Sequence, residues 1–331
     1  MSPQQKALAT RTRRRPSVLE PASAAAAQPL ATTDGARPLG ERLGVRKTYK
    51  LYIGGEFPRT ESGRSYEVYG AGGELLANAC RATRKDIREA VRAARKAFPG
   101  WAARTAFNRG QVLYRIAELL EGRRDQFIVE VAAAEGVTRR RAARTVDTAI
   151  DRWVWYAGWA DKYSQLMGTV NSVAGSYFNF SVPEPTGVVG VIAPEGSSLL
   201  GLVSRLAPVI VSGNAAVAIA SETRPLPAVT LTEVLATSDV PGGVVNLVTG
   251  LRRELVSHLA GHMDVNGLDA FGLDPAAAVA VEELATENVK RVARPPAGGA
   301  DAVDWLSEAA QSPYLIGQFT ETKTVWHPIG S

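Results

Sequence analysis

The fold class is decided by residues 184–194, which read EPTGVVGVIAP. Two further apolar runs, at 215–220 and 244–248, are also bounded by glycine or proline, and helical patterns at 199–211 and 229–235 separate the three runs. Continuous apolar runs that alternate with helices are typical of parallel strands buried on both faces. We therefore expect an α/β protein with a Rossmann-like, doubly wound parallel sheet.

The residues beyond the third run complete the predicted sheet. A weaker strand pattern at 267–271 and a short one at 290–293 lie on either side of a helix near 277–285. The sheet is therefore expected to have about five strands.

Three helices are expected before the sheet. The first, at 86–98, has one apolar face, with Thr83 as its N-cap and Pro99-Gly100 at its end. Two longer helical patterns follow at 107–127 and 140–167.

A further strand is expected from Ser176 to Val182. Pro183 and Pro185 separate this strand from the apolar run that follows. Because proline has no backbone N–H, we expect these two residues to interrupt strand pairing.

The composition is ordinary for a protein with a buried core, since hydrophobic residues make up 45% and charged residues 21% of the 331 residues. The length favours two domains. No apolar run approaches the roughly 18 to 20 residues of a membrane span, so we expect no membrane partner. The single cysteine, Cys80, excludes an internal disulfide and favours a reducing, cytoplasmic location.

Residues 1–47 form a basic arm rich in alanine and proline. They hold nine Lys and Arg and three acidic residues, a balance of +6 within a total of +5, so the remaining residues carry about −1. Because the arm has few large apolar residues, we expect it to be disordered. A solvated tail is the favoured interpretation, although the run Arg13-Arg14-Arg15 leaves contact with an anionic surface open. The body is not expected to bind nucleic acid.

Several segments, in their order and spacing, resemble the aldehyde dehydrogenase superfamily. They are LYIGGEF at 51–57, YAGWADK at 156–162, EPTGVVGVIAP at 184–194, LAP at 206–208 with GN at 213–214, PGGVVNLVTG at 241–250 and FTETKTVW at 319–326. The resemblance covers about residues 48–294 and resumes at Phe319. It implies a nucleotide-binding-type domain at 48–295, oligomerisation strands near 169–183 and a C-terminal oligomerisation strand at 319–328.

The resemblance also implies that the catalytic domain is absent. The family carries that domain between the last strand of the nucleotide domain and the C-terminal strand, where this chain has only residues 296–318. The proline and glycine residues at the start of this stretch suit a linker, with a short helix expected at 303–310.

The catalytic groups that the resemblance implies are missing from their positions. The family attacks its aldehyde with a cysteine thiolate, whereas Cys80 lies far upstream at an apolar strand position and is expected to serve packing. Gly196 stands where a side-chain amide would stabilise the oxyanion, beside Glu195, whose charge would oppose it. Pro295 stands where a glutamate would act as general base. We therefore expect no catalytic residue.

The positions for a cofactor are altered as well. In the family, a lysine and a glutamate past the second sheet strand hold the adenosine ribose; here Ile219 replaces the lysine and Glu222 matches the glutamate. The turn that holds the pyrophosphate reads FGLDP at 271–275. In that turn Asp274 adds a negative charge and Pro275 lacks an amide donor. We expect no cofactor, with NAD or NADP the remaining candidates and Glu222 the one candidate contact.

No metal site is expected. His258 and His262 have a helical i, i+4 spacing, but no Glu or Cys cluster accompanies them. Ser197 and Ser198 have no histidine near them in the sequence and suit caps of the helix that begins at Leu199 better than a nucleophile.

Three functional hypotheses follow. The favoured one is a non-catalytic aldehyde-dehydrogenase-like subunit, a pseudoenzyme, that assembles with a full-length aldehyde dehydrogenase or with itself through the strands from Ser176 to Val182 and from Phe319 to Trp326. The alternative is an NAD(P)-dependent oxidoreductase that acts on aldehydes with replaced groups, for which only Glu195 and Glu222 are candidates. A decaying gene product is the third, and the preserved apolar periodicity argues against it.

Overall fold

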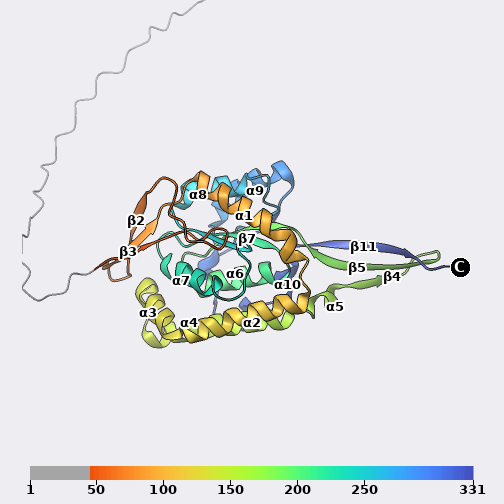
Figure 1. Ribbon diagram of the computed structural model, residues 1–331, viewed down its shortest axis with the longest axis horizontal. Coiled ribbons are helices and arrows are strands. Elements are labelled where there is room, and N and C mark those ends of the chain that lie inside the picture. Colours follow the sequence, from red (N-terminus) through yellow and green to blue (C-terminus); the bar gives the residue numbers. More distant parts are fainter. Residues whose placement is uncertain (1–44, 331) are drawn as a thin grey trace, which may run out of the picture. The chain divides into compact units, whose positions relative to one another are not determined.

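The chain divides into two units, Met1–Gly44 and Val45–Ser331. The structure, a computed structural model, describes residues 45–330 (Figure 1). The predicted disordered arm at 1–47 lies outside the described residues except for its last three.

The described unit is built from ten α-helices and eleven strands. The helices are α1 (Arg84–Ala102), α2 (Ala106–Gly122), α3 (Arg124–Glu135), α4 (Arg139–Trp159), α5 (Tyr163–Met167), α6 (Leu200–Val211), α7 (Leu226–Leu235), α8 (Arg252–Ala260), α9 (Pro275–Ala285) and α10 (Pro313–Gly317). The strands are β1 (Thr48–Tyr49), β2 (Ser65–Tyr69), β3 (Leu75–Cys80), β4 (Thr169–Asn171), β5 (Tyr177–Pro185), β6 (Val188–Ile192), β7 (Ala215–Ile219), β8 (Val245–Val248), β9 (Gly267–Asp269), β10 (Arg291–Ala293) and β11 (Thr320–Pro328).

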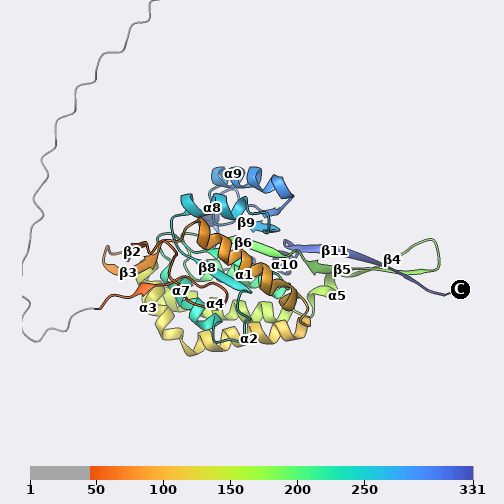
Figure 2. The same ribbon diagram turned by 45° about the horizontal axis from the view of Figure 1, so that its top comes forward.

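The predicted parallel sheet is confirmed. Five strands pair in the order β10-β9-β6-β7-β8, and every pairing is parallel. Helices cover both faces, with α1, α8 and α9 on one side and α2, α4, α6 and α7 on the other (Figures 1 and 2). The carboxyl ends of the central strands therefore meet at one edge of the sheet, called the carboxyl edge below.

The two faces of the sheet bury separate apolar clusters because side chains alternate along a strand. Val189 and Val191 of β6 belong to the cluster beneath α2, α4, α6 and α7, whereas Val188 and Ile192 belong to the cluster beneath α1, α8 and α9. All four side chains are fully buried. This explains why the sequence of β6 is apolar throughout instead of alternating.

Helix α1 begins where the sequence predicts and ends later than predicted. Thr83 and Asp86 form a capping box. Pro99, expected to end the helix, lies inside it. A proline in the last turn removes one helical hydrogen bond, and the buried Trp101 holds that turn in place by donating its indole N–H to the carbonyl of Ile210 at 2.9 Å.

The two long helical patterns that follow are each divided. The pattern expected at 107–127 becomes α2 and α3, because Arg123 leaves helical geometry with φ −114° and ψ 13°. The pattern expected at 140–167 becomes α4 and α5.

The expectation that Pro183 and Pro185 interrupt pairing is wrong. β11 pairs with β5 along its whole length, from Thr320 opposite Pro185 to Pro328 opposite Tyr177. On the other side, β4 pairs only with residues 179–181 of β5. The prolines therefore lie where β5 has one open edge, which is where a strand tolerates a residue without an N–H.

The sheet β11-β5-β4, called the extended sheet below, projects from the rest of the described unit (Figures 1 and 2). It contains both segments that the sequence analysis assigned to assembly.

Candidate functional site

The carboxyl edge is the place where doubly wound sheets bind ligands, so the groups gathered there define the candidate site. Glu195 follows β6, residues 221–223 follow β7, Arg252 follows β8 and Gly272 follows β9. Four loops that are far apart in the sequence thus meet at one edge.

Glu195 lies at the centre of this edge and accepts several hydrogen bonds. Its carboxylate accepts bonds from the Ser221 hydroxyl at 2.7 Å, the Glu222 amide at 2.8 Å and the Thr223 hydroxyl at 3.1 Å. Its Oε1 lies 2.6 Å from Nε of Arg252. Burial alone would raise the pKa of Glu195, but the Arg252 charge and the donated hydrogen bonds outweigh burial and hold that pKa below its ordinary value.

Arg252 fills the space between the ends of β6 and β9. Its guanidinium donates to the carbonyls of Ala193 and Gly272, the second at 2.8 Å. Its side chain is 15% exposed, compared with 34% for Glu195. Burial lowers the pKa of Arg252, while the Glu195 charge acts in the opposite direction. The two side chains form a half-buried ion pair that joins loops after three strands.

The turn after β9 leaves no gap between it and β6. A Cβ placed on Gly272 would lie 2.2 Å from the carbonyl oxygen of Ile192 and 2.4 Å from that of Ala193. Only glycine fits this approach. The turn is thus pressed directly on the end of the neighbouring strand.

Asp274 and Pro275 occupy the N-terminus of α9, as the sequence indicated. The Asp274 side chain accepts hydrogen bonds from the amides of Ala276 and Ala277 at 3.0 and 2.9 Å, and Pro275 is the first helical residue. The donors that a helix N-terminus offers to an anion are therefore bound by the chain's own carboxylate.

Glu222, the candidate cofactor residue, lies at the carboxyl edge but is already bonded. Its Oε2 accepts a hydrogen bond from the backbone amide of Arg252 at 2.7 Å, at the start of α8. Ile219 is fully buried in β7. Of the two cofactor positions drawn from the resemblance, one therefore packs in the core and the other caps a helix.

The three positions considered for catalysis hold no catalytic side chain of the kind that the resemblance implies. Cys80 is a buried free thiol at the end of β3. Gly196 follows Glu195, and a Cβ there would lie 2.5 Å from Oδ1 of Asp301, so residues 295–318 approach it closely. Pro295 lies after β10, at the start of that same segment.

Residues 295–318 are held tightly against the body. Arg152 of α4, which is 1% exposed, donates to the carbonyls of Trp305 and Ala310 and to the hydroxyl of Ser204 on α6. The expectation of a single helix at 303–310 is wrong. Two 3₁₀ turns (Ala300–Ala302 and Glu308–Ala310) and α10 take its place. Because the carbonyls of Trp305 and Ala310 accept hydrogen bonds from the buried arginine, they are not used in the backbone hydrogen bonds of a regular helix.

A second buried arginine joins this segment to the sheet. Nε of Arg205 on α6 donates to Asp269 of β9 at 2.7 Å, and both side chains are at most 3% exposed. Its Nη2 donates to Gln318 at 2.9 Å, and its guanidinium lies 4.3 Å from the Phe271 ring centroid. Trp305 packs edge-on against the same Phe271 ring, at 5.6 Å. The segment therefore lies beside the carboxyl edge.

Three arginines in these contacts, Arg152, Arg205 and Arg252, were not identified from the sequence. Arg252 begins α8, although a basic residue in the first turn opposes the helix dipole. This mismatch two residues after Gly250 was a usable signal. Arg152 stands next to Trp153 on a buried helix face, where a lone charge among apolar residues indicates a specific partner.

The remaining sequence candidates have structural contacts. Ser197 accepts a hydrogen bond from the Gly201 amide in the first turn of α6 at 2.9 Å, although Leu199 holds the N-cap position, and Ser198 donates to Glu135. His258 and His262 border one surface hollow together with basic residues of α1. Within residues 45–330, no three His, Cys, Asp or Glu side chains are grouped so as to hold a metal ion. None of the helices in this range is long and apolar enough to cross a membrane.

Comparison with known proteins agrees with the fold. The model of the "Aldehyde dehydrogenase family" matches residues 59–303. Aldehyde dehydrogenase, cytosolic 1, of Elephantulus edwardii is 31% identical over 250 residues, which cover 73% of this chain and 49% of that protein. Retinal dehydrogenase 2 of Homo sapiens is 32% identical over 253 residues, or 74% of this chain and 48% of the relative.

Solved structures give the same result. An aldehyde dehydrogenase from Bacillus cereus in complex with NAD⁺ has a TM-score of 0.70 and 26% identity, covering 74% of this chain and 50% of that one. HpcC from Thermus thermophilus also has a TM-score of 0.70, with 30% identity and coverage of 74% and 47%. This chain spans about half the length of the relatives that it matches. The family model covers most of the chain, and the parallel sheet and helices superpose on those of solved members; the chain belongs to the aldehyde dehydrogenase family.

Proposed function

We propose that this chain is a non-catalytic member of the aldehyde dehydrogenase family, a pseudoenzyme, that acts by assembling with a full-length aldehyde dehydrogenase. The observation that carries the proposal is the ion pair of Arg252 and Glu195 at the carboxyl edge, 2.6 Å apart. A family member that binds no nucleotide there has no hydride acceptor, and we propose that it acts by binding another protein.

The residues at the carboxyl edge do not fit NAD or NADP. A dinucleotide needs free amides at a helix N-terminus and space beside the strand ends. Asp274 bonds two amides of α9, the Gly272 turn lies directly on β6, and Arg252 bridges them. A Bacillus cereus relative forms an NAD⁺ complex, and the proposal is that this chain has lost that capacity.

The missing chemistry belongs to the same proposal. By resemblance, the family's catalytic domain lies between the strands that correspond to β10 and β11. Here residues 295–318 connect these two strands and are fixed by Arg152 and Arg205. We propose that this segment replaces the catalytic domain and covers surface that the domain would otherwise bury.

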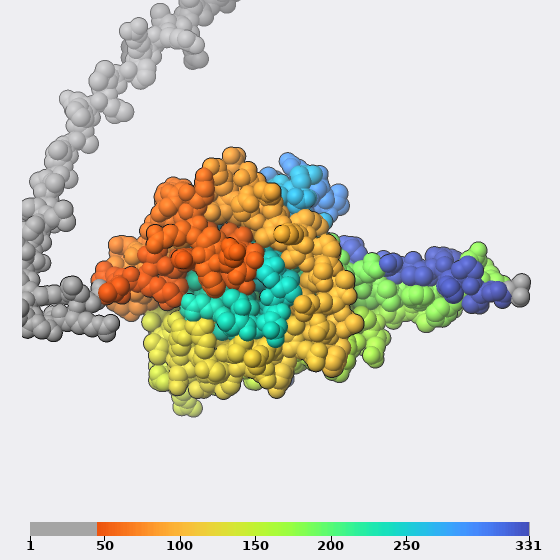
Figure 3. Space-filling model, in the orientation of Figure 1, coloured from red at the N-terminus to blue at the C-terminus, as the bar shows by residue number. Residues whose placement is uncertain are grey.

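The extended sheet supports the part of the proposal that concerns assembly. Tyr177, Phe178 and Trp326 are each about half exposed on it, and Val170 is 72% exposed. Among the described residues, β11 pairs with β5 alone, so its outer edge is open. Figure 3 shows this sheet uncovered on the face in view. A long open strand with exposed aromatic side chains is a surface for another chain.

A full-length aldehyde dehydrogenase is the proposed partner because such a protein carries a catalytic domain on which this β11 edge can pair. A second copy of this chain is the other candidate. The single cysteine is a buried free thiol, which suits a reducing compartment, and we place the assembly in the cytoplasm.

Co-expression tests the proposal. The tagged chain is expressed with a full-length aldehyde dehydrogenase of the same cell, and the native mass of the purified material is measured. We expect a defined mixed oligomer, and we expect Trp326→Glu on the extended sheet to abolish it. Met263→Gln is the control, because Met263 is similarly exposed (62% against 59%) but lies outside that sheet. Recovery of this chain alone, as a monomer or homo-oligomer, would refute the proposed partner.

A further inference from the structure

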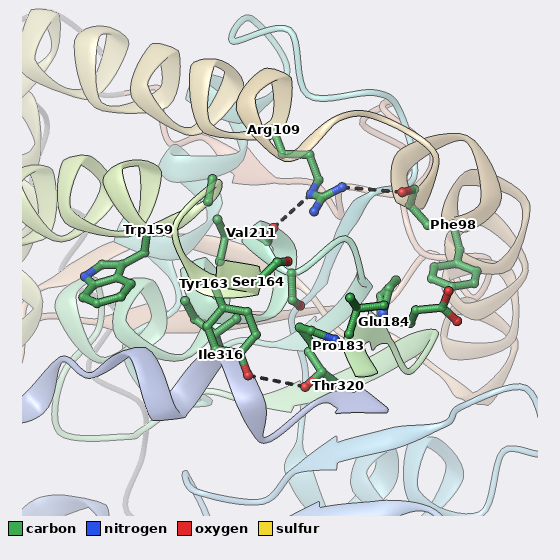
Figure 4. A pocket seen from close by; sticks show the side chains of 15 residues that line it. Phe98, Arg109, Trp159, Tyr163, Ser164, Pro183, Glu184, Val211, Ile316 and Thr320 are labelled. Atoms are coloured by element: carbon green, nitrogen blue, oxygen red, sulfur yellow. Dashed lines mark hydrogen bonds between the residues drawn. The ribbon is translucent and has the colours of Figure 1, made fainter. Parts of the chain in front are cut away.

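A cavity of about 510 Å³ lies where the extended sheet joins the helices (Figure 4). Its walls come from the end of α1, the start of α2, the α4–α5 junction, the base of β5 and the end of α6. This volume lies within the range of small-molecule sites. β5 and the end of α6 border the cavity, and they lead into the amino ends of β6 and β7. The cavity therefore lies at the end of these strands opposite to the carboxyl edge.

Arg109 of α2 points into this cavity (Figure 4). Its Nε donates to the carbonyl of Val211 at 3.0 Å, and its Nη1 donates to that of Arg104 at 2.6 Å. Within residues 45–330, neither a carboxylate partner nor a hydrogen bond of Nη2 is found for this guanidinium. Burial lowers the pKa of Arg109, which reflects a cation held without a counter-charge.

Gly213 lies beside the guanidinium in a backbone conformation that favours glycine. Gly213 has φ +99°, and a Cβ there would lie 3.5 Å from Cζ of Arg109 and 3.3 Å from Pro185. Because this φ is positive, any other residue at this position would be strained.

The other walls of the cavity combine apolar side chains with polar groups. Phe98, Trp159 and Ile316 line it, as do the hydroxyls of Tyr163 and Ser164. The one acidic residue in the lining, Glu184, is paired with Lys323 at 2.7 Å, and both are about half exposed. The cavity thus combines one cation that has no carboxylate partner with a wall of mixed polarity that includes aromatic side chains.

We infer that this cavity is a binding site for a small carboxylate with an aromatic or apolar body. The carboxylate accepts from Nη2 of Arg109, and the ring lies in the cavity beside this guanidinium. The inference is independent of the proposed function, because it requires neither a partner protein nor the carboxyl edge.

Fluorine NMR tests the inference with 4-fluorobenzoate as the probe and the neutral 4-fluorobenzamide as comparison. We expect saturable line broadening of the benzoate and at least tenfold weaker binding of the amide, a difference of about 1.4 kcal/mol. Arg109→Gln is expected to weaken benzoate binding by at least tenfold, since a charge-assisted hydrogen bond is lost. Arg115→Gln on the same helix is the matched control and should leave it unchanged.

A second variant keeps the test decisive where Arg109→Gln fails to fold. Ser164→Phe adds a ring to the lining from an exposed position on α5 without altering Arg109, and it is expected to abolish binding of the benzoate. The inference is overturned by equal binding of the two probes, by unsaturable binding to the unmodified protein, or by unchanged benzoate binding in either Arg109→Gln or Ser164→Phe.

Discussion

The Arg252–Glu195 pair can be tested by a double-mutant cycle. Glu195→Gln removes one charge with little change in volume and leaves Arg252, 15% exposed, without its counter-charge. Arg252→Met removes the guanidinium and its bonds to the Ala193 and Gly272 carbonyls. Breaking a fully buried pair costs about 3–5 kcal/mol, but a third of the Glu195 side chain is exposed and screened. We therefore expect each single change to cost about 2–3 kcal/mol.

The double variant should cost less than the sum of the two single changes, because the second substitution removes a group that the first has left unpaired. The expected coupling energy is about 1.5–2 kcal/mol. Urea unfolding at pH 7 measures it from the shift in midpoint at constant slope.

The exposed pair of Arg139 and Asp125, 3.2 Å apart with side chains 67% and 82% exposed, is the control. Its coupling should stay below about 0.5 kcal/mol. Coupling of Arg252 with Glu195 that is no larger than this control would refute the view that the pair joins the loops of the carboxyl edge.

Further predictions concern pH, the segment at 295–318 and the core. Because the folded pKa of Glu195 lies below its ordinary value, the contribution of this carboxylate to stability is present at neutral pH and is lost as pH falls below about 4.5 towards the folded pKa. The difference in stability between the unmodified protein and Glu195→Gln, measured by urea unfolding, should therefore shrink on acidification. A difference that grows would contradict this. Arg152→Met should raise amide hydrogen exchange in residues 300–318 more than in β6 and β7, and a uniform increase would mean that this arginine does not hold the segment. Leu113→Ala should lower the free energy of unfolding by about 2–5 kcal/mol because Leu113 is fully buried. Tyr114→Ala next to it, at a position 52% exposed, should change that free energy by less than about 0.5 kcal/mol. Similar losses of stability in both variants would refute the placement of α2.

The sheet could be predicted from the sequence because its strands are buried on both faces and therefore read as continuous apolar runs. The Thr83 cap was located from the capping residue in front of an apolar helical pattern. These are local signals, each contained within a few residues.

What the sequence did not predict depends on contacts between distant residues. The pairing of β5 through Pro183 and Pro185 requires β11, which is more than 130 residues away. The replacement of the helix expected at 303–310 requires Arg152 on α4. Glu195 was recognised as a charge in the wrong place for catalysis, but its partner Arg252 could be identified only in three dimensions.

The most direct test of the account is a calorimetric titration of the purified protein with NAD⁺ and NADP⁺, with a full-length aldehyde dehydrogenase of the same cell as positive control. If Arg252, Gly272 and Asp274 close the carboxyl edge, neither nucleotide produces saturable heat with this chain at concentrations that saturate the control. Saturable binding of either nucleotide, lost in Glu222→Gln, would contradict the account and favour an NAD(P)-dependent enzyme.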